Sequence, residues 1–195
     1  MSKECINTEE SLQLIQQIKD QTRTQLIKKN VPYFLLWGYL TIFFSIIHLF
    51  TFQTTFGKWM WAAFPLIGYI QAYFTKKILN KKYPGKTLSQ RTANTIWAVI
   101  GITLIGILFI PNNIVHISNL FAVVILFVGM ATCITGFLYN LNAFKISSII
   151  GIVTALVMSY LNLNSLVINE SIFAVVFFVM QCLPAHYEII TNRRK

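Results

Sequence analysis

Charged residues are scarce in this chain of 195 residues. Only 11% are Asp, Glu, Lys or Arg, whereas 55% are hydrophobic and the mean hydropathy is +0.62. Soluble domains contain roughly a quarter charged residues, so this composition excludes an ordinary soluble domain. The charges gather at the start, around positions 76 to 91 and at the end, leaving long apolar segments between them. The sequence therefore predicts an all-α fold, a polytopic transmembrane helix bundle.

Cysteines and chemical motifs are also sparse. Cys5, Cys133 and Cys182 are too few and too scattered for a disulfide framework or a zinc site, and we interpret the last two as small packing residues. Gly-rich phosphate loops, H-E-x-x-H helices and G-x-S-x-G elbows are absent from the sequence. Positions 7 to 18 are polar, so we expect no cleaved signal peptide and an uncleaved first anchor. We predict no cofactor, no metal and no catalytic residue.

Acidic residues number only six, and none falls centrally in an apolar run. A buried charge is the usual pointer to ion-coupled transport, because it is costly in hydrocarbon. We expect Glu170, at the outer start of the last run, and Glu188, beside His186 at its inner end, to reach headgroups or water. His48 and His116 share the outer side, but two imidazoles alone make a weak metal proposal.

Six apolar runs are close to the roughly 17 to 25 residues that a tilted helix needs to cross a bilayer. They cover residues 31–52, 58–75, 93–110, 119–139, 146–162 and 171–188. The predicted organisation is a cytoplasmic amphipathic helix over 1–30, a six-span domain over 31–190 and a basic tail over 191–195.

Basic residues set the predicted orientation. Of the 16 Lys and Arg residues, all but Lys58 fall in the N-terminal segment, the connections after the second and fourth runs, or the tail. Cytoplasmic segments carry this excess, so both termini are predicted to be cytoplasmic. The same rule accounts for the net charge of +10 without nucleic-acid binding.

The N-terminal segment has a helical pattern. Asn7 and Glu10 resemble a capping box, and one apolar face contains Leu12, Ile15, Ile18 and Leu26. This face could lie in the headgroup region, pack under the spans, self-associate or dock onto a protein partner.

A basic connection follows the second predicted span. Its six positive residues, with no acidic residue among them, are Lys76, Lys77, Lys81, Lys82, Lys86 and Arg91. Each such residue gains about 1 kcal/mol from anionic lipid at the inner leaflet, so we predict headgroup contact here.

The fifth run carries small residues at every fourth position: Ser147, Gly151, Ala155 and Ser159. Such a face lets another backbone approach closely. Its partner could be the fourth span, which we favour because Thr132 and Gly136 repeat the spacing, or a second copy in a homo-oligomer. Gln181, near mid-depth in the sixth run, is expected to hydrogen-bond to another helix.

Kinks are expected where proline interrupts a span. Pro65 with Gly68 in the second run and Pro184 in the sixth predict local bends.

Two short strings carry a resemblance. Glu10-Ser11-Leu12 lies in the amphipathic stretch that leads to Tyr33 through Leu40, which read YFLLWGYL. With the basic connection and the alternating apolar spans, the chain resembles a group of small uncharacterised bacterial inner-membrane proteins. The resemblance implies a six-span membrane protein, and no functional residue follows from it.

Three hypotheses of function follow. The leading one is a non-enzymatic structural, regulatory or accessory subunit that acts through the N-terminal helix and the basic surface. The alternative is a small transporter or permease component. A lipid-acting enzyme ranks last, because His186 and Glu188 are the only candidate acid–base pair near one face.

Overall fold

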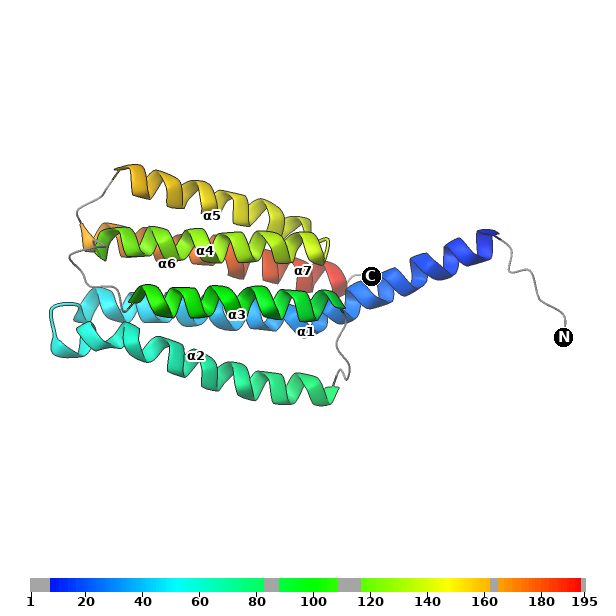
Figure 1. The fold of residues 1–195 in the computed structure, drawn as a ribbon, viewed down its shortest axis with the longest axis horizontal. Helices are drawn as coiled ribbons and strands as arrows, with labels where there is room; N and C mark the ends of the chain where they lie inside the picture. Colours follow the sequence, from blue (N-terminus) through cyan, green and yellow to red (C-terminus); the bar gives the residue numbers. More distant parts are fainter. Residues whose placement is uncertain (1–7, 83–87, 109–116, 162–164, 194–195) are drawn as a thin grey trace.

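The computed structural model describes residues 8–82, 88–108, 117–161 and 165–193. These residues form helices joined by short turns, and no strand occurs among them, which confirms the all-α prediction. Figure 1 shows the helices lying side by side as a bundle. Their bounds are α1 Thr8–Thr51, α2 Thr55–Lys82, α3 Leu88–Leu108, α4 Ile117–Leu138, α5 Asn142–Leu161, α6 Leu166–Phe177, the π-helical turn η1 Phe178–Cys182, and α7 Leu183–Arg193.

Four described helical segments are long and apolar enough to cross a membrane. They are Ile27–Thr51, Leu120–Leu138, Asn142–Leu161 and Leu166–Asn192, which correspond to the first, fourth, fifth and sixth predicted spans. This is compatible with a multi-pass membrane protein. Helices α2 and α3, the second and third predicted spans, do not meet the same criterion within the described residues. Helix α2 nevertheless packs against α1, and α3 packs against α4, within the same bundle (Figure 1).

Helix α1 differs from its prediction. An N-terminal helix over 1–30 and a span from residue 31 were expected as separate elements, whereas one helix of 44 residues runs through Pro32. Proline removes one backbone donor but need not end a helix in an apolar bundle, where neighbouring helices and local adjustments satisfy the freed backbone group. The N-terminal part of α1 consequently extends beyond the other helices (Figure 1).

The connection between α4 and α5 is a tight turn. Asn140 adopts a left-handed φ of 52°, which asparagine tolerates better than most residues. Leu141 N–H donates to Gly136 O at 2.8 Å and Asn140 N–H donates to Phe137 O at 3.2 Å, the pattern of a Schellman motif. The turn sets α5 antiparallel to α4.

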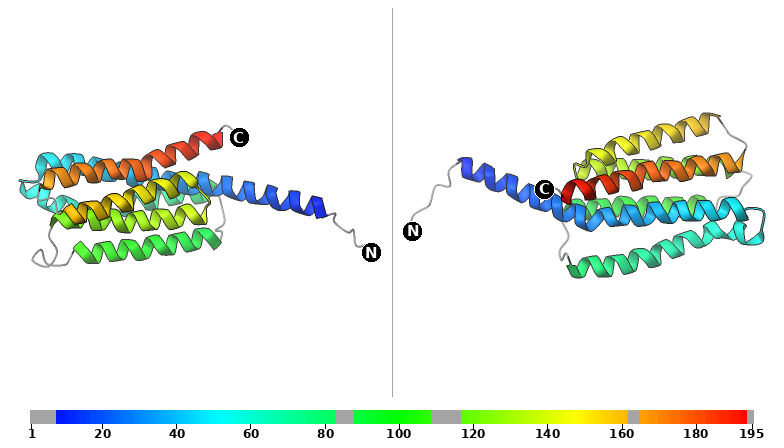
Figure 2. Two further views of the ribbon diagram at one scale, coloured as in Figure 1. Left: turned by 90° about the horizontal axis from the view of Figure 1, so that it is seen from above. Right: turned by 180° about the vertical axis from the view of Figure 1, so that it is seen from behind.

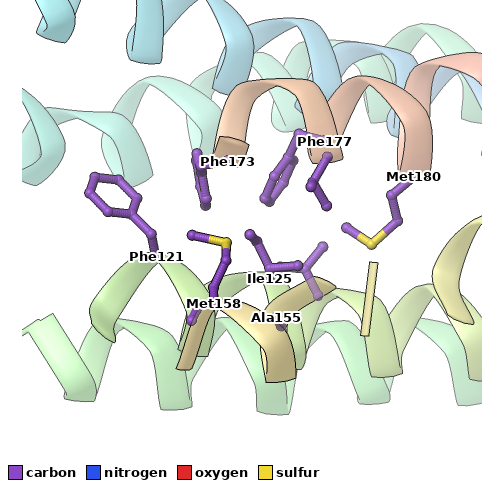
Figure 3. Packing of buried hydrophobic residues seen from close by; sticks show 10 residues of the cluster. Phe121, Ile125, Ala155, Met158, Phe173, Phe177 and Met180 are labelled. Carbon is purple, nitrogen blue, oxygen red and sulfur yellow. The ribbon is translucent and has the colours of Figure 1, made fainter. Parts of the chain in front are cut away.

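A large apolar cluster holds α4, α5 and α6 together. Figure 3 shows its side chains converging from the three helices. Phe121 and Ile125 come from α4, Ala155 and Met158 from α5, and Phe173, Phe177 and Met180 from α6 and η1. Ile125 and Met180 are fully buried, so this cluster forms the packed centre of the bundle.

The last helix contains a π turn instead of a simple proline kink. Leu183 N–H donates to Phe178 O, five residues back, directly before Pro184. Since Pro184 has no N–H, the carbonyl four residues earlier, Met180 O, loses its α-helical donor. The Ser147 hydroxyl of α5 lies 3.2 Å from this carbonyl and 3.3 Å from Phe144 O of its own helix, so its one proton can serve either. A neighbouring helix can thus satisfy the backbone group that proline leaves open.

Candidate functional site

Helix α1 and the α6–η1–α7 helix run antiparallel and in contact along most of their length. Residues of the two helices meet at three levels. His48 contacts Glu170, the backbone of Gly38 lies against Gln181, and Thr24 contacts Asn192. Figure 2 shows the end of α7 lying close to the point where α1 leaves the bundle. Most buried polar residues outside α4 and α5 lie along this contact.

The strongest candidate site is the buried pair of His48 and Glu170. The Nδ1 atom of His48 lies 2.7 Å from Oε2 and 2.9 Å from Oε1 of Glu170. Glu170 is 0% exposed and His48 is 7% exposed. His48 Nδ1 is therefore within hydrogen-bond distance of both oxygens of a carboxylate that is shielded from solvent.

This pair overturns an expectation drawn from the sequence. Glu170 was expected to reach headgroups or water at the start of the sixth span, and no buried charge was expected. The helix begins earlier, with Ser165 as its N-cap and Leu166 as its first residue, so Glu170 already lies in the second turn. There it faces α1 at the depth of His48. From the sequence, His116 was considered as a neighbour of His48, but it lies outside the described residues. Glu170 was not recognised as the partner of His48.

One aromatic ring packs directly against the buried pair. The ring of Trp61 in α2 lies 6.0 Å from that of His48 and 5.8 Å from that of Phe173, both edge-on. Trp61 Nε1 and Ser45 Oγ, one turn before His48, are buried and have no hydrogen-bond partner in the described part of the chain. Unpartnered groups of this kind are costly in a static core, so their presence beside the pair marks a candidate site for a polar or charged species.

A buried carboxylate beside an imidazole is a candidate proton-binding site. Groups of three or more His, Cys, Asp or Glu residues that could hold a metal do not occur among the described residues. Glu170 and His48 have no hydroxyl or thiol nucleophile bonded to them in the described structure. Among the described residues, the site therefore consists of one carboxylate and one imidazole.

The end of the same contact near the C-terminus of α7 is also polar. Lys29 and Glu188 are both buried, and the antiparallel register places them at the same level. Glu188 was expected to reach water beside His186, but the two lie two residues apart on α7, about 200° around the helix. His186 is exposed and contacts the Tyr39 hydroxyl at 2.7 Å through Nε2. The two residues therefore do not share a site, which removes the acid–base pair of the enzyme hypothesis.

The small-residue face of α5 packs inside the bundle. Ser147, Gly151 and Ala155 are buried, and a Cβ at Gly151 would lie 2.6 Å from the Met180 sulfur of η1. This face therefore meets the last helix, whereas the fourth span had been favoured. Ser159 is exposed, because positions four apart drift about 40° per step around a helix; Met158 takes the buried position instead.

Gln181 is buried in η1 against Gly38 of α1. Its predicted hydrogen bond to another helix is not seen: Oε1 has no partner among the described residues. The π turn places this amide against a glycine, which offers no side-chain donor.

The predicted surface residues are only partly described. Lys76, Lys77 and Arg91 are exposed, as lipid contact requires, while the side chains of Lys81 and Lys82 and all of Lys86 lie outside the described structure. On the N-terminal face, Leu12 is 57% exposed. The side chains of Ile15, Ile18 and Leu26 are likewise outside it.

Comparisons with protein-family models, curated proteins and solved structures give no match to this chain.

Proposed function

We propose that the protein is a small membrane transporter, or the transport subunit of a larger one, in which the buried pair binds the coupling proton. The proposed topology has six spans with both termini in the cytoplasm of a bacterial cell. The chain acts on a solute and carries out no covalent chemistry. The observation that supports this function is the burial of Glu170 against His48.

Burying an ionised carboxylate away from water requires free energy. A carboxylate inside the hydrocarbon region costs several kcal/mol and is rare unless it serves a pathway for ions or protons. A pair used only for packing could be replaced by apolar residues at little cost. Unpartnered Ser45 Oγ and Trp61 Nε1 beside the pair add polar groups that packing alone does not need.

A pH jump on protein adsorbed to a solid-supported membrane tests this function. Proton binding inside the membrane displaces charge, so we expect a transient current from the full-length protein. Glu170→Gln and His48→Gln should lose this current. His186→Gln, which changes an exposed histidine on α7, serves as the matched control and should keep it. An undiminished current in Glu170→Gln, or no current from the wild-type protein, contradicts the proposal.

An accessory role is the second candidate. It is favoured by the N-terminal part of α1, which extends beyond the bundle and exposes Leu12 and Leu14 (Figure 1). Cross-linking in native membranes should then capture a protein with the full chain but not with a chain that lacks residues 8–24. This deletion keeps the apolar segment Ile27–Thr51. Identical cross-links from both chains contradict the accessory role.

A further inference from the structure

A groove of about 890 Å³ runs between α1 and α2, which diverge with distance from the turn that joins them (Figure 2). Its volume falls in the range of about 300 to 1,000 Å³ that is typical of sites for drug-sized molecules. Along α1 the lining extends from Leu35 to Ile47, about 18 Å, whereas one leaflet fills half of a hydrocarbon core of roughly 30 Å. The groove is therefore long enough for an acyl chain of one leaflet.

The lining of the groove changes along its length. Near the turn between the two helices it is apolar, with Phe44, Ile47 and Phe56. At the opposite end it includes Gln71 and Tyr39. Side chains of a helix lean towards its N-terminus, which brings the Tyr39 hydroxyl towards the level of Gln71 on the antiparallel α2. The groove thus combines a long apolar part with one polar end.

The polar end offers hydrogen bonds but no charge. None of the described residues that line the groove is charged. The Tyr39 hydroxyl lies 2.7 Å from Nε2 of His186, and whichever of the two donates, the hydroxyl can make a second hydrogen bond. The Gln71 amide provides both donors and an acceptor. An amide that faces hydrocarbon is costly without a polar partner, so this end favours an occupant with hydroxyl or carbonyl groups.

The depth of the polar end also favours an uncharged occupant. Lys28 precedes Leu35 by seven residues on α1, and Lys76 follows Gln71 by five on α2, distances of about 10 and 8 Å along the helices. Both lysines are exposed, and the proposed topology places them at the headgroups. A phosphate at Gln71 would lie below that plane, where a charge is costly. A hydroxyl or an ester does not carry this cost.

We propose that the groove binds an uncharged lipid of the diacylglycerol type. One acyl chain lies along the apolar lining, and the hydroxyl or ester groups bind at Gln71 and Tyr39. The site is separate from the buried pair, because neither His48 nor Glu170 lines the groove. The inference uses the proposed topology but not proton binding, so it goes beyond the proposed transport function.

Photo-labelling of the full-length protein in phosphatidylcholine nanodiscs tests the inference. The probe is a diacylglycerol with a diazirine in one acyl chain, and a phosphatidic acid with the same chains differs from it only by the phosphate. We expect the diacylglycerol to label α1 and α2 along the groove, and unlabelled diolein to compete with it. Half-maximal labelling should require at least about tenfold more phosphatidic acid, because its charge would be held below the headgroups.

Matched variants locate the site. Gln71→Leu and Tyr39→Phe each remove one polar group, so at least about threefold more diolein should be needed for competition. Tyr69→Phe removes an exposed tyrosine hydroxyl outside the groove and should leave competition unchanged. Ile67→Trp should fill the groove and abolish saturable labelling, whereas Leu66→Trp adds the same bulk outside the lining and should preserve it.

Three results would overturn the inference: equal labelling by the two probes, labelling that diolein does not reduce, and equal behaviour of the two tryptophan variants. The labelled positions in the wild-type protein keep the test valid if Ile67→Trp does not fold, because saturable labels away from α1 and α2 also overturn it. The pH-jump current is an independent measurement. Failure of the lipid inference therefore leaves the transport proposal standing, and loss of the current leaves the lipid inference standing.

Discussion

At the residue scale, the buried pair joins two helices that are 122 positions apart in the sequence. Each partner compensates the other, because an isolated charge in an apolar interior is far more costly than a paired one. In the proposed function, the pair also binds and releases a proton. Its stabilising and functional roles can therefore be separated by substituting one partner or both.

Glu170→Leu alone should lower the free energy of unfolding by about 3 kcal/mol, because His48 is left buried without its partner. The double variant His48→Leu/Glu170→Leu should recover much of the lost free energy of unfolding, since no uncompensated polar group remains. Thermal or denaturant unfolding in detergent measures both. A double variant that is less stable than either single one contradicts a mutually compensating pair.

Gly38 is the second residue with a specific structural demand. A Cβ at this position would lie 2.6 Å from the Cys182 sulfur and 3.2 Å from Gln181 Cβ. Gly38→Ala should therefore destabilise the protein by about 1 to 3 kcal/mol through overpacking. Gly101→Ala is the matched control, because nothing lies within 4 Å of its added methyl group. In unfolding experiments the control should be neutral or slightly stabilising; equal losses contradict the close approach of α1 and η1.

At the element scale, the π turn is the most distinctive feature. It places Met180, Gln181 and Cys182 at the centre of the bundle, where three helices meet. Pro184 deprives the Met180 carbonyl of its donor, and Ser147 on α5 can replace it. The small-residue face of α5 thus supplies both close approach and a hydrogen bond.

Ser147→Ala should lower the free energy of unfolding by about 1 kcal/mol in the wild-type background. In a Pro184→Ala background the loss should be smaller, because the new N–H of residue 184 can donate to Met180 O. A double-mutant cycle from denaturant unfolding measures this coupling. Additive effects of the two substitutions contradict the compensation of Pro184 by Ser147.

At the scale of the whole molecule, the topology depends on whether α2 and α3 cross the membrane. Among the long helices of the described residues, these two are not among the four candidate membrane spans. If both cross the membrane, the basic stretch from Lys76 to Arg91 lies inside. If neither crosses, the same stretch lies outside, against the usual distribution of Lys and Arg.

Labelling of single cysteines in a cysteine-free background distinguishes these arrangements. We expect a cysteine at Thr54 to react with a membrane-impermeant reagent from outside, and one at Lys77 only after the membrane is opened. Both positions are exposed. Asn140, in the turn between α4 and α5, is inside in either arrangement and serves as the control. Labelling of the Lys77 position in intact cells contradicts six spans.

Much of the fold could be predicted from composition and apolar run length. The helical class and four of the spans follow from them, with boundaries within a few residues of the structure. The small residues of the fifth run were recognised from their spacing, although Ser159 was included wrongly. The continuation of α1 through Pro32 was not predicted. Proline often ends a helix, but packing against other helices can satisfy the backbone group that it leaves without a donor.

The candidate site could not be predicted in the same way. The last predicted span began at residue 171, one residue after Glu170, and this small error assigned a buried carboxylate to the membrane surface. Sequence alone determined that the chain is helical and apolar, and it predicted an orientation from the basic residues, because these properties depend on local composition. Only the tertiary structure decided that Glu170 is buried against His48, because burial of a charge depends on which helix stands opposite at the same depth.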